Sequence, residues 1–265
     1  MRRKETNYSS PALGRCLGSG KDAEVFELGQ AVIKLFKPGV PKHTAFREAA
    51  ALAQAEALGL SVPSVHQVQQ IDGRWGLAMD RADGPSFADV MLASPSQRIA
   101  YLNAMAVLHG RIHACEAVFF GSLKAKLAAN IRHATALDAR QRGELLTELG
   151  ALPAGDQLCH GDFHPWNILG PVDRPLVIDW TSAAKGNPAA DVCRSYVLIT
   201  PIAPELARSY VEIYAQTTGK SIGDIFRWLR VVAAARLAEG VDNEVDGLLA
   251  MLGEEDMGRG QAGTQ

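Results

Sequence analysis

Hydrophobic positions in the first part of the chain follow the short period of β-strands, with one helical segment among them. Apolar and β-branched residues form runs at residues 13–36, separated by glycine-containing turns, and again at residues 65–70 and 75–80 around an Asp-Gly turn. Residues 42–58 are instead rich in alanine, a strong helix former, and are followed by Gly59. The pattern predicts a mostly antiparallel sheet with one helix.

The pattern becomes helical after residues 81–85, RADGP, which are punctuated by glycine and proline. This change predicts an α+β fold with two lobes: an amino-terminal lobe at residues 1–82 and a mostly helical lobe at residues 83–256, beginning at residues 87–89. A glycine-rich stretch at residues 257–265 has no apolar anchor and is predicted to form a flexible tail. Helices are expected near residues 96–115, 123–138, 140–150, 191–199, 204–217 and 222–239.

Composition and charge narrow the functional classes. The chain has 265 residues, of which 47% are hydrophobic and 21% charged, as in an ordinary globular protein. A net charge of -2 leaves no basic footprint, so nucleic acid is not expected as a partner. No signal peptide and no long apolar run are visible, so we expect a cytoplasmic protein without a membrane partner. Dispersed cysteines without paired spacing are typical of reduced thiols: Cys16, Cys115, Cys159 and Cys193.

Two polar motifs interrupt the helical half. Residues 158–169, LCHGDFHPWNIL, place Asp162 and Asn167 in one short loop, which a proline stiffens. Residues 175–182, PLVIDWTS, place Asp179 at the end of an apolar run that indicates a short buried strand. Transfer of a phosphoryl group from ATP requires a carboxylate that orients the acceptor hydroxyl, and oxygen ligands for Mg2+. The two acids and the amide supply such a set.

These motifs resemble those of a known family. Residues 160–162, HGD, then Asn167, then residues 178–180, IDW, are similar to the catalytic loop and the metal-binding loop of the aminoglycoside phosphotransferase family. That family is similar to protein kinases, which have arginine between the histidine and the aspartate, and Phe-Gly after the metal-binding aspartate. Gly161 and Trp180 stand at the corresponding positions here and favour the small-molecule branch.

The resemblance implies a bilobal protein-kinase-like fold and a role for each polar residue. Asp162 would be the catalytic base, and Asn167 and Asp179 would be the Mg2+ ligands. His160 would brace the catalytic loop as a structural residue. Asp191, near the start of a helix, would be the family's buried acid that braces the same loop, although an acid is also favoured at a helix amino terminus by the helix dipole alone.

A kinase-like fold also predicts a phosphate-covering loop, a strand lysine and a helix glutamate upstream, in that order. Residues 18–25, GSGKDAEV, follow the pattern G-x-G-x-x-G-x-V, except that Ala23 stands at the third glycine. Glycines let backbone amides approach phosphate oxygens, and the valine would begin the returning strand beneath adenine. The expected ATP contacts in this loop are Gly18, Ser19, Gly20 and Val25.

The strand lysine and the helix glutamate can both be found. Lys34 ends the apolar run 31–34, AVIK, and would place its ammonium on the α and β phosphates. Glu48, on the alanine-rich helix, is the candidate partner of Lys34, and Glu56 is the fallback. Each of these charges could instead be a solvated surface group. In the resembled family the backbone between the lobes binds adenine, so a hinge is expected at about residues 79–84, with ATP contacts at Met79, Asp80, Arg81 and Ala82.

A metal-dependent hydrolase is the rival from another enzyme class, because an H-x-D-x-H cluster and two further acids could bind a transition metal. That alternative leaves the glycine loop, Lys34 and Glu48 unexplained. His109 and His113 lie four residues apart on one helix face but lack the glutamate of a zinc-protease helix, and such histidines are more often core or interface residues. The rival ligand set is His160, Asp162, His164, Asp179 and Asp191.

The link after Asp179 bears on the acceptor. Residues 180–186 are too few for the long activation segment on which protein kinases dock peptides, so the acceptor is expected to be a hydroxyl of a small molecule. The resembled family phosphorylates aminoglycosides and other antibiotics, and relatives act on choline, amino alcohols and sugars. An inactive kinase-like module that binds a ligand is a third alternative, because Ala23 departs from the glycine-loop pattern.

An amine-bearing acceptor, such as an aminoglycoside, would fit an acidic pocket. The carboxy-terminal half offers several acids for it, although an acidic run is usually a solvated face. These acids are Glu239, Asp242, Glu244, Asp246, Glu254 and Glu255.

Overall fold

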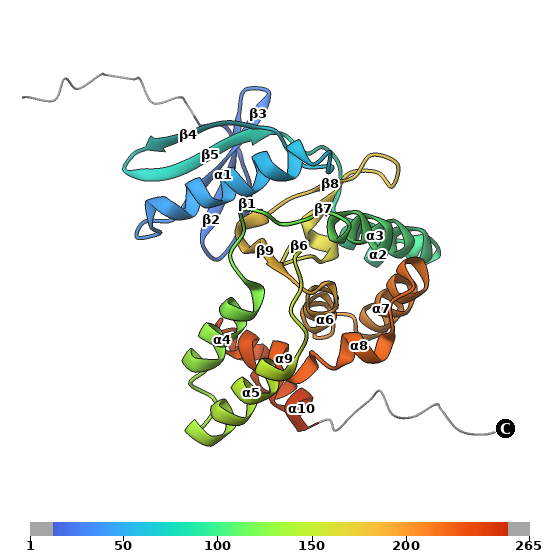
Figure 1. Ribbon diagram of the computed structural model, residues 1–265. Coiled ribbons are helices and arrows are strands. Elements are labelled where there is room, and N and C mark those ends of the chain that lie inside the picture. Colours follow the sequence, from blue (N-terminus) through green and yellow to red (C-terminus); the bar gives the residue numbers. More distant parts are fainter. Residues whose placement is uncertain (1–12, 254–265) are drawn as a thin grey trace, which may run out of the picture. The chain divides into compact units, whose positions relative to one another are not determined.

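The computed structural model describes residues 13–253 and divides them into two units (Figure 1). The first unit consists of residues 13–83 and Leu176–Thr181, and the second of Gly84–Pro175 and residues 182–253. An antiparallel sheet dominates the first unit and helices dominate the second, so the predicted α+β, kinase-like fold class is confirmed. The predicted flexible tail at residues 257–265 lies outside the described residues.

The sheet of the first unit is built from hairpins. Among the described residues it has five antiparallel strands in the order β1-β2-β3-β5-β4. Asp72 and Gly73 connect the last two strands, and both have the positive φ, 48° and 77°, that a tight hairpin turn requires. The strands are β1 Cys16–Ser19, β2 Ala23–Leu28, β3 Ala31–Phe36, β4 Val65–Ile71 and β5 Arg74–Asp80.

Helix α1, Lys42–Ala57, packs on β4 and β5, as Figure 1 shows. Its buried residues recur at helical spacing, and most are alanines, whose small side chains let the helix approach the sheet closely. Glu48 is the exception, because this carboxylate lies on the buried face. Ala45 of the same face packs with Ala23 and Phe36 of the sheet.

The segment Leu176–Thr181 brings Asp179 into the first unit. The short strand β8, Leu176–Val177, is anchored by the Val177 N–H, which donates to the Ser61 carbonyl at 2.8 Å. The Trp180 indole N–H donates back to the Val177 carbonyl at 3.0 Å, and the Trp180 side chain is almost fully buried. The aspartate is therefore held between two fixed residues.

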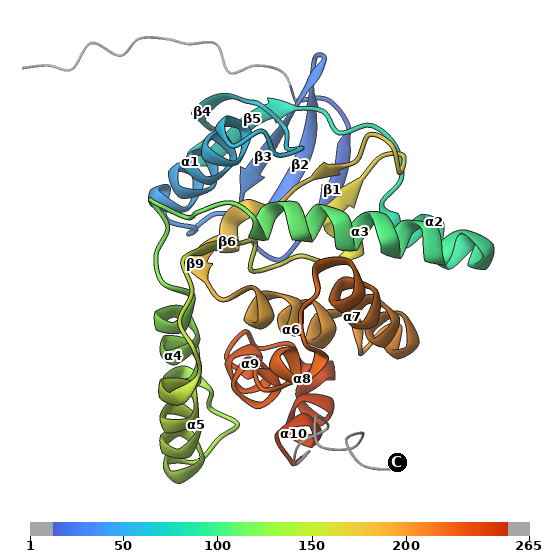
Figure 2. The same ribbon diagram turned by 45° about the vertical axis from the view of Figure 1, so that its right-hand side comes forward.

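In the second unit, helix α6 is the central element. Figure 2 shows it between α7 and α9, and it packs against both and against β6. Asn187 caps its amino terminus by accepting from the Ala189 N–H, and Pro188 occupies the first turn. The helices are α2 Phe87–Ala93, α3 Arg98–His113, α4 Leu123–His133, α5 Ala139–Ala151, α6 Pro188–Ile199, α7 Pro204–Thr218, α8 Ile222–Phe226, α9 Leu229–Leu237 and α10 Val245–Gly253.

Short strands carry the loops of this unit. Strand β6, Gln157–Cys159, pairs antiparallel with β9, Ala184–Gly186. The strand β7, Ile168–Leu169, follows the 3-10 turn Pro165–Asn167. The 3-10 turn Trp180–Ser182, which begins in the first unit, precedes β9.

Several expected helices have different bounds in the structure, and α6 begins at Pro188, three residues before its expected start. The helix expected at residues 123–138 ends at His133, because Asp138 instead caps the next helix and exchanges capping hydrogen bonds with Gln141. The helix expected at residues 222–239 is divided into α8 and α9. At the division the Trp228 N–H donates to the Ile225 carbonyl, three residues back, so the turn is tighter than an α-helix.

Within residues 13–253, no helix combines the length and the apolar character that a membrane crossing requires.

Candidate functional site

The loop between β6 and β7 carries Asp162 and Asn167, and a glycine shapes it. Gly161 has φ of 76°, in the left-handed region. A Cβ built on it would lie 2.4 Å from the Ser182 carbonyl oxygen, so no side chain fits. The glycine that distinguishes this motif from that of protein kinases is therefore required by the local packing.

Asp162 and Asn167 are brought together. The Asn167 side-chain amide nitrogen donates to the Asp162 carbonyl oxygen at 2.9 Å and to its carboxylate Oδ2 at 3.2 Å. The amide oxygen of Asn167 is then the atom that could bind a cation. The Asp162 N–H donates to His160 Nδ1 at 3.2 Å, which fixes the backbone of the loop from within.

Two cationic or potentially cationic groups stand beside the Asp162 carboxylate. His164 Nε2 lies 3.6 Å from Oδ2, and Arg194 Nη2 lies 3.6 Å from Oδ1. Burial raises the pKa of the Asp162 carboxyl, but the neighbouring His164 and Arg194 outweigh burial and hold the pKa well below its usual value. The group is therefore ionised at neutral pH and can orient a hydroxyl, whose proton it receives only as the oxygen loses electron density to phosphorus.

Asp191, in the first turn of α6, braces this loop. Its Oδ2 accepts from the His160 N–H at 2.6 Å, and its Oδ1 accepts from the Gly161 N–H at 2.8 Å. The side chain is 1% exposed. Successive backbone amides bound to one carboxylate leave the loop little freedom.

Arg194 is a residue of this site that the sequence analysis missed. Its Nε donates to the Gly161 carbonyl, and its Nη1 and Nη2 donate to the two carboxylate oxygens of Glu239 at 2.8 and 3.2 Å. The signal that could have found it is its position one helical turn after Asp191, on the same face of α6.

The acids expected in an acceptor pocket are partly committed elsewhere. Glu239 is bound by Arg194 and also by Arg236. Glu244 accepts from the Arg236 guanidinium at 2.8 and 2.9 Å. The structure therefore balances both of these acids with arginines, while Glu254 and Glu255 lie outside the described residues.

In the first unit, Lys34 of β3 lies between two carboxylates. Its Nζ donates to Glu48 Oε1 at 2.8 Å and to Asp179 Oδ1 at 2.9 Å. Burial alone lowers the pKa of the Lys34 ammonium, but the two carboxylates outweigh it and raise that pKa. Burial raises the pKa of Glu48 although Lys34 opposes the shift. The fallback Glu56 instead accepts from the Ser64 hydroxyl.

Asp179 has a backbone conformation that is rare for a residue with a side chain. Its φ is 59°, and Asp72 is the other non-glycine residue with positive φ among those described. Asp72 is explained by its hairpin turn. The Asp179 conformation is held by Lys34 and by the Thr181 hydroxyl, which donates to Oδ1 at 2.8 Å. Strained backbone of this kind concentrates at functional sites.

The glycine loop joins β1 and β2. Gly18 pairs with Val25, and the Gly20 N–H closes the loop on the Ala23 carbonyl at 2.8 Å. A Cβ built on Gly18 would meet no atom within 4 Å, so the fold itself does not require this glycine. Ala23 packs on Phe36, which explains why a methyl group replaces the third glycine of the pattern.

The residues of the expected hinge have side chains that are held by neighbours. The Asp80 carboxylate accepts from the Ser64 N–H at 3.2 Å and lies 2.7 Å from His66 Nε2. Arg81 forms ion pairs with Glu27 and Asp83. Part of their backbone is also paired: the Asp80 N–H donates to the Ser64 carbonyl at 3.0 Å, and Met79 pairs with Val32 and Val65 in the sheet. Met79 and Asp80 lie at the end of β5, and Ala82 follows it.

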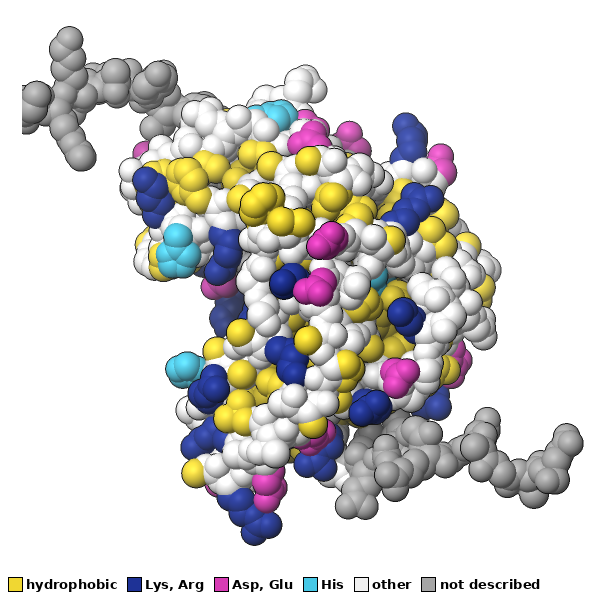
Figure 3. Space-filling view, viewed as in Figure 1, with side chains coloured by type: hydrophobic (Ala, Val, Ile, Leu, Met, Phe, Trp, Pro, Cys, Tyr) yellow, Lys and Arg dark blue, Asp and Glu magenta, His cyan; other side chains and the backbone are white. Residues whose placement is uncertain are grey.

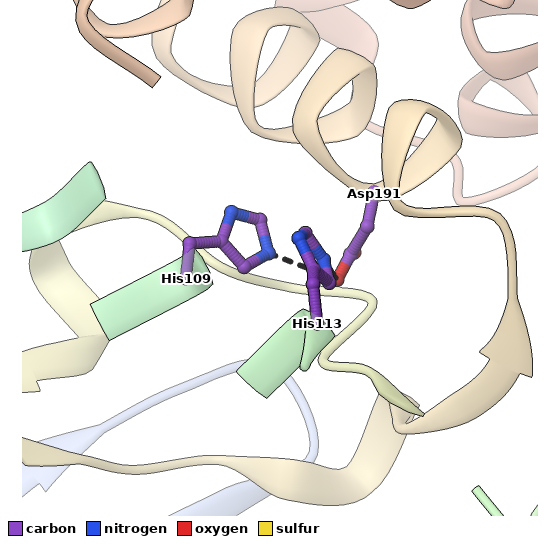
Figure 4. A group of neighbouring side chains, drawn as sticks. All are labelled: His109, His113 and Asp191. Atoms are coloured by element: carbon purple, nitrogen blue, oxygen red, sulfur yellow. Dashed lines mark hydrogen bonds and ion pairs between the residues drawn. The ribbon is translucent and has the colours of Figure 1, made fainter. Parts of the chain in front are cut away.

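The part of the rival ligand set that lies in the second unit does not come together as a metal site. Among the described residues, the histidines and acid of the H-x-D-x-H motif are not gathered as a ligand cluster, and His160 Nδ1 already accepts from the Asp162 backbone. The group that does gather is His109, His113 and Asp191, whose nitrogen and oxygen atoms lie within 4.8 Å of one another (Figure 4).

An antiparallel sheet with a buried lysine–glutamate pair, and a helical unit with an Asp–Asn loop, define a protein of the kinase-like class. The chain belongs to the phosphotransferase enzyme family, whose model matches residues 15–228. A comparison with curated protein sequences gave no match.

Solved structures share the fold at low identity. One is a thermostable mutant of aminoglycoside phosphotransferase APH(4)-Ia with ADP and hygromycin B, at TM-score 0.66 and 16% identity over 92% of this chain and 90% of that chain. Another is the streptomycin-ATP-APH(2")-IIa ternary complex, at TM-score 0.59 and 18% identity over 93% of each chain. A third is choline kinase LicA from Streptococcus pneumoniae, at TM-score 0.63 and 14% identity over 91% and 92%.

Proposed function

We propose that this phosphotransferase moves the γ-phosphate of ATP to a hydroxyl group of a small molecule. The observation that carries the proposal is the Asp162 carboxylate, which Asn167 holds at 3.2 Å in a loop braced by Asp191. The Lys34–Glu48 pair in the other unit supports it, because a fixed ammonium is needed to hold the phosphates. Membership of the phosphotransferase family and the ADP, ATP and AMP-PNP bound to structural neighbours support it further.

Each residue has a defined task in this reaction. Asp162 orients the acceptor hydroxyl and receives its proton while the oxygen–phosphorus bond forms and the bond between the γ-phosphorus and the β,γ-bridging oxygen breaks, which leaves ADP. Lys34 holds the α and β phosphates, and Glu48 holds Lys34. The glycine loop, Gly18, Ser19 and Gly20 with Val25, covers the nucleotide, and the backbone at residues 79–82 contacts adenine.

The donor set of this chain fits Mg2+. Asn167 offers an amide oxygen and Asp179 a carboxylate, which are the hard oxygen ligands that Mg2+ prefers. When bound, the ion would neutralise charge on the phosphate oxygens. The tight contact of Asp179 with Lys34 places the ligand carboxylate beside the phosphate-binding ammonium.

For the acceptor, we propose an amine-bearing alcohol such as an aminoglycoside. Structural neighbours are complexes with hygromycin B and streptomycin, and this supports the proposal. The acids of the carboxy-terminal half add little to it, because Glu239 and Glu244 are balanced by arginines. Nor do α4 and α5 offer an acidic patch on the face drawn in Figure 3, because the side chains that gather along them at the lower left are mostly basic.

A metabolic kinase that acts on choline, an amino alcohol or a sugar is the second candidate. Choline kinase LicA, with TM-score 0.63, favours it specifically. Both candidates share the same chemistry and differ in the acceptor alone. A cytoplasmic location stays a prediction.

The test is ADP release with Mg2+ and ATP over a panel of aminoglycosides, choline-like amines and sugars. We expect turnover with one class, and Asp162→Asn to lower it by ~100-fold or more while nucleotide affinity is kept, because the variant loses the proton acceptor. Asp173→Asn, on an exposed loop, is the matched control and should be unchanged. Nucleotide binding without turnover on any acceptor would favour the inactive module, and full turnover by Asp162→Asn would remove the assigned base.

A further inference from the structure

Two histidines of α3 converge on Asp191, as Figure 4 shows. His109 Nε2 lies 3.0 Å and His113 Nε2 lies 3.2 Å from the same oxygen, Oδ2. This is the oxygen that also accepts from the His160 N–H of the catalytic loop. The three side chains are buried, with exposed fractions of 0%, 4% and 1% in chain order.

Helix α7 places a tyrosine on the far nitrogen of each ring. The Tyr210 hydroxyl contacts His109 Nδ1, and the Tyr214 hydroxyl lies 2.7 Å from His113 Nδ1. The histidines are four residues apart on α3, and the tyrosines are four residues apart on α7. Two parallel chains of hydrogen bonds, each from a tyrosine through a histidine to Asp191 and called relays below, therefore cross this packed pair of helices. No task in the phosphoryl transfer was assigned above to these histidines and tyrosines.

The tautomer of each ring follows from its two contacts. A neutral histidine carries one N–H and one lone pair. If Nδ1 carried the hydrogen, the lone pair of Nε2 would face a carboxylate oxygen at 3.0 or 3.2 Å, which is repulsive. With the hydrogen on Nε2, each ring donates to Asp191 and accepts from a tyrosine hydroxyl, so every buried group is satisfied.

The lowered pKa of His109 agrees with a neutral ring at that position. Burial, together with the neighbouring His113, lowers the pKa of His109 to about 3. Burial raises the pKa of Asp191, but the hydrogen bonds from the two histidines outweigh it and hold the pKa well below its usual value. Burial also raises the pKa of Tyr210 well above its usual value, so this hydroxyl keeps the hydrogen it donates.

Two histidines one turn apart with an aspartate are also a metal-ligand set. Here the set needs no ion, because each ring nitrogen has a protein partner and Oδ2 of Asp191 is already bound to the catalytic loop. A metal on Oδ2 would compete with the His160 N–H for that oxygen. The hydrogen-bond relay therefore accounts for the cluster more fully than a metal centre.

We infer that Tyr210–His109 and Tyr214–His113 are positioning pairs for the catalytic loop: each tyrosine fixes its histidine as the Nε2–H tautomer, and the two donated hydrogens hold the Asp191 carboxylate against the His160 and Gly161 amides. The inference deepens the proposed function and rests on it only for the kinetic readout. The tautomers and the protection of the two amides can be measured whether or not an acceptor is known.

The first experiment uses the unaltered protein. Two-bond 1H–15N correlation spectra of protein labelled with 15N-histidine distinguish the Nε2–H tautomer, the Nδ1–H tautomer, the cation and a metal-bound ring. We expect the Nε2–H pattern for both His109 and His113 at pH 7. An Nδ1–H or cationic pattern overturns the inference, and so does stoichiometric zinc in the purified protein.

The second experiment tests the effect on the loop. His109→Leu removes the donor, and His109→Gln restores a side-chain N–H near the Nε2 position. We expect His109→Leu to raise hydrogen exchange of the His160 and Gly161 amides by ~10-fold, the equivalent of one lost hydrogen bond, and His109→Gln to return it towards the original rate. His133→Leu, at an exposed histidine of α4, is the matched control.

The kinetic prediction follows from the same variants. His109→Leu should lower kcat by ~10-fold with little change in the KM for ATP, and His109→Gln should recover most of that loss. Equal exchange rates in His109→Leu and the original protein overturn the inference. If no acceptor is turned over at all, the proposed function fails while the spectra and the exchange rates still decide the relay.

Discussion

Gly161, in the loop that carries Asp162 and Asn167, has φ of 76°, and a Cβ built on it would clash with the Ser182 carbonyl oxygen. We expect Gly161→Ala to lower the free energy of unfolding by about 1–3 kcal/mol through backbone strain, and to lower turnover further because the loop must shift. Denaturant unfolding followed by intrinsic fluorescence measures the first effect. Gly143→Ala, in α5 where a Cβ meets nothing within 4 Å, is the control and should not destabilise. Equal stability of the two variants would contradict the prediction.

Single residues differ in how far sequence could locate them. Asp162, Asn167 and Asp179 could be proposed from the sequence because each stands at a fixed short spacing within its own motif. Arg194 and Tyr210 were missed because their partners are remote: Arg194 lies 33 positions from Gly161 in the sequence, and Tyr210 lies 101 positions from His109. Such pairs form only when helices pack, so the spacing of Arg194 after Asp191 on α6 could point to the residue but not to its partners.

At the scale of elements, the glycine loop between β1 and β2 gives a prediction that separates folding from binding. A methyl group at Gly18 meets no protein atom, so Gly18→Ala should change stability by less than about 0.5 kcal/mol. It should weaken binding of an ATP analogue with Mg2+ by about tenfold, because the loop amides could no longer approach the phosphates as closely. Calorimetry measures the affinity. Gly121→Ala, in an open loop of the other unit, is the control, and unchanged affinity in Gly18→Ala would remove the loop from the nucleotide site.

Elements were predictable where local pattern decides them. Alternating apolar residues and the Asp72-Gly73 turn located β4 and β5 to within one residue, and an alanine-rich run located α1. The end of α4 and the division between α8 and α9 were wrong, because a capping box and one tightened turn set them. Strands β6 and β9 have three residues each and are held by pairing with each other, so neither carries a periodic pattern of its own.

At the scale of the whole molecule, the chain enters each of its two units twice. The sequence pattern divides it near residues 82 and 83, whereas the structure also places Leu176–Thr181 in the first unit. Lys34 consequently meets Asp179 across 145 residues of sequence. The first unit therefore depends on a segment that is synthesised after most of the second unit, and the two units cannot be separated by a single cut.

The stability of the folded chain should depend on pH through its buried histidine. His109 has a pKa of about 3 in the folded protein, against 6.5 for an ordinary histidine. Between these values the unfolded chain binds a proton that the folded protein does not. The contribution of His109 to the free energy of unfolding is therefore fully present above pH 6.5. It is lost as pH falls towards 3, with a slope of about 1.4 kcal/mol per pH unit. The titratable groups that face the ring are His113, His160, Asp191, Tyr210 and Tyr214.

Denaturant unfolding at intervals between pH 7 and pH 4 measures this loss. Asp191 adds little to this loss over most of that range, because its carboxyl, whose pKa is held well below the ordinary 3.8, stays ionised in the fold and is also mostly ionised in the unfolded chain until the pH nears 4. His109→Gln removes the titrating ring. The free energy of unfolding of this variant should therefore fall less steeply with decreasing pH, and the difference in slope should be about 1.4 kcal/mol per pH unit, the value for one proton. His133→Gln removes an exposed histidine and should keep the original slope. Parallel curves for His109→Gln and the original protein would show that the ring is protonated in the fold, and would contradict a neutral relay behind the catalytic loop.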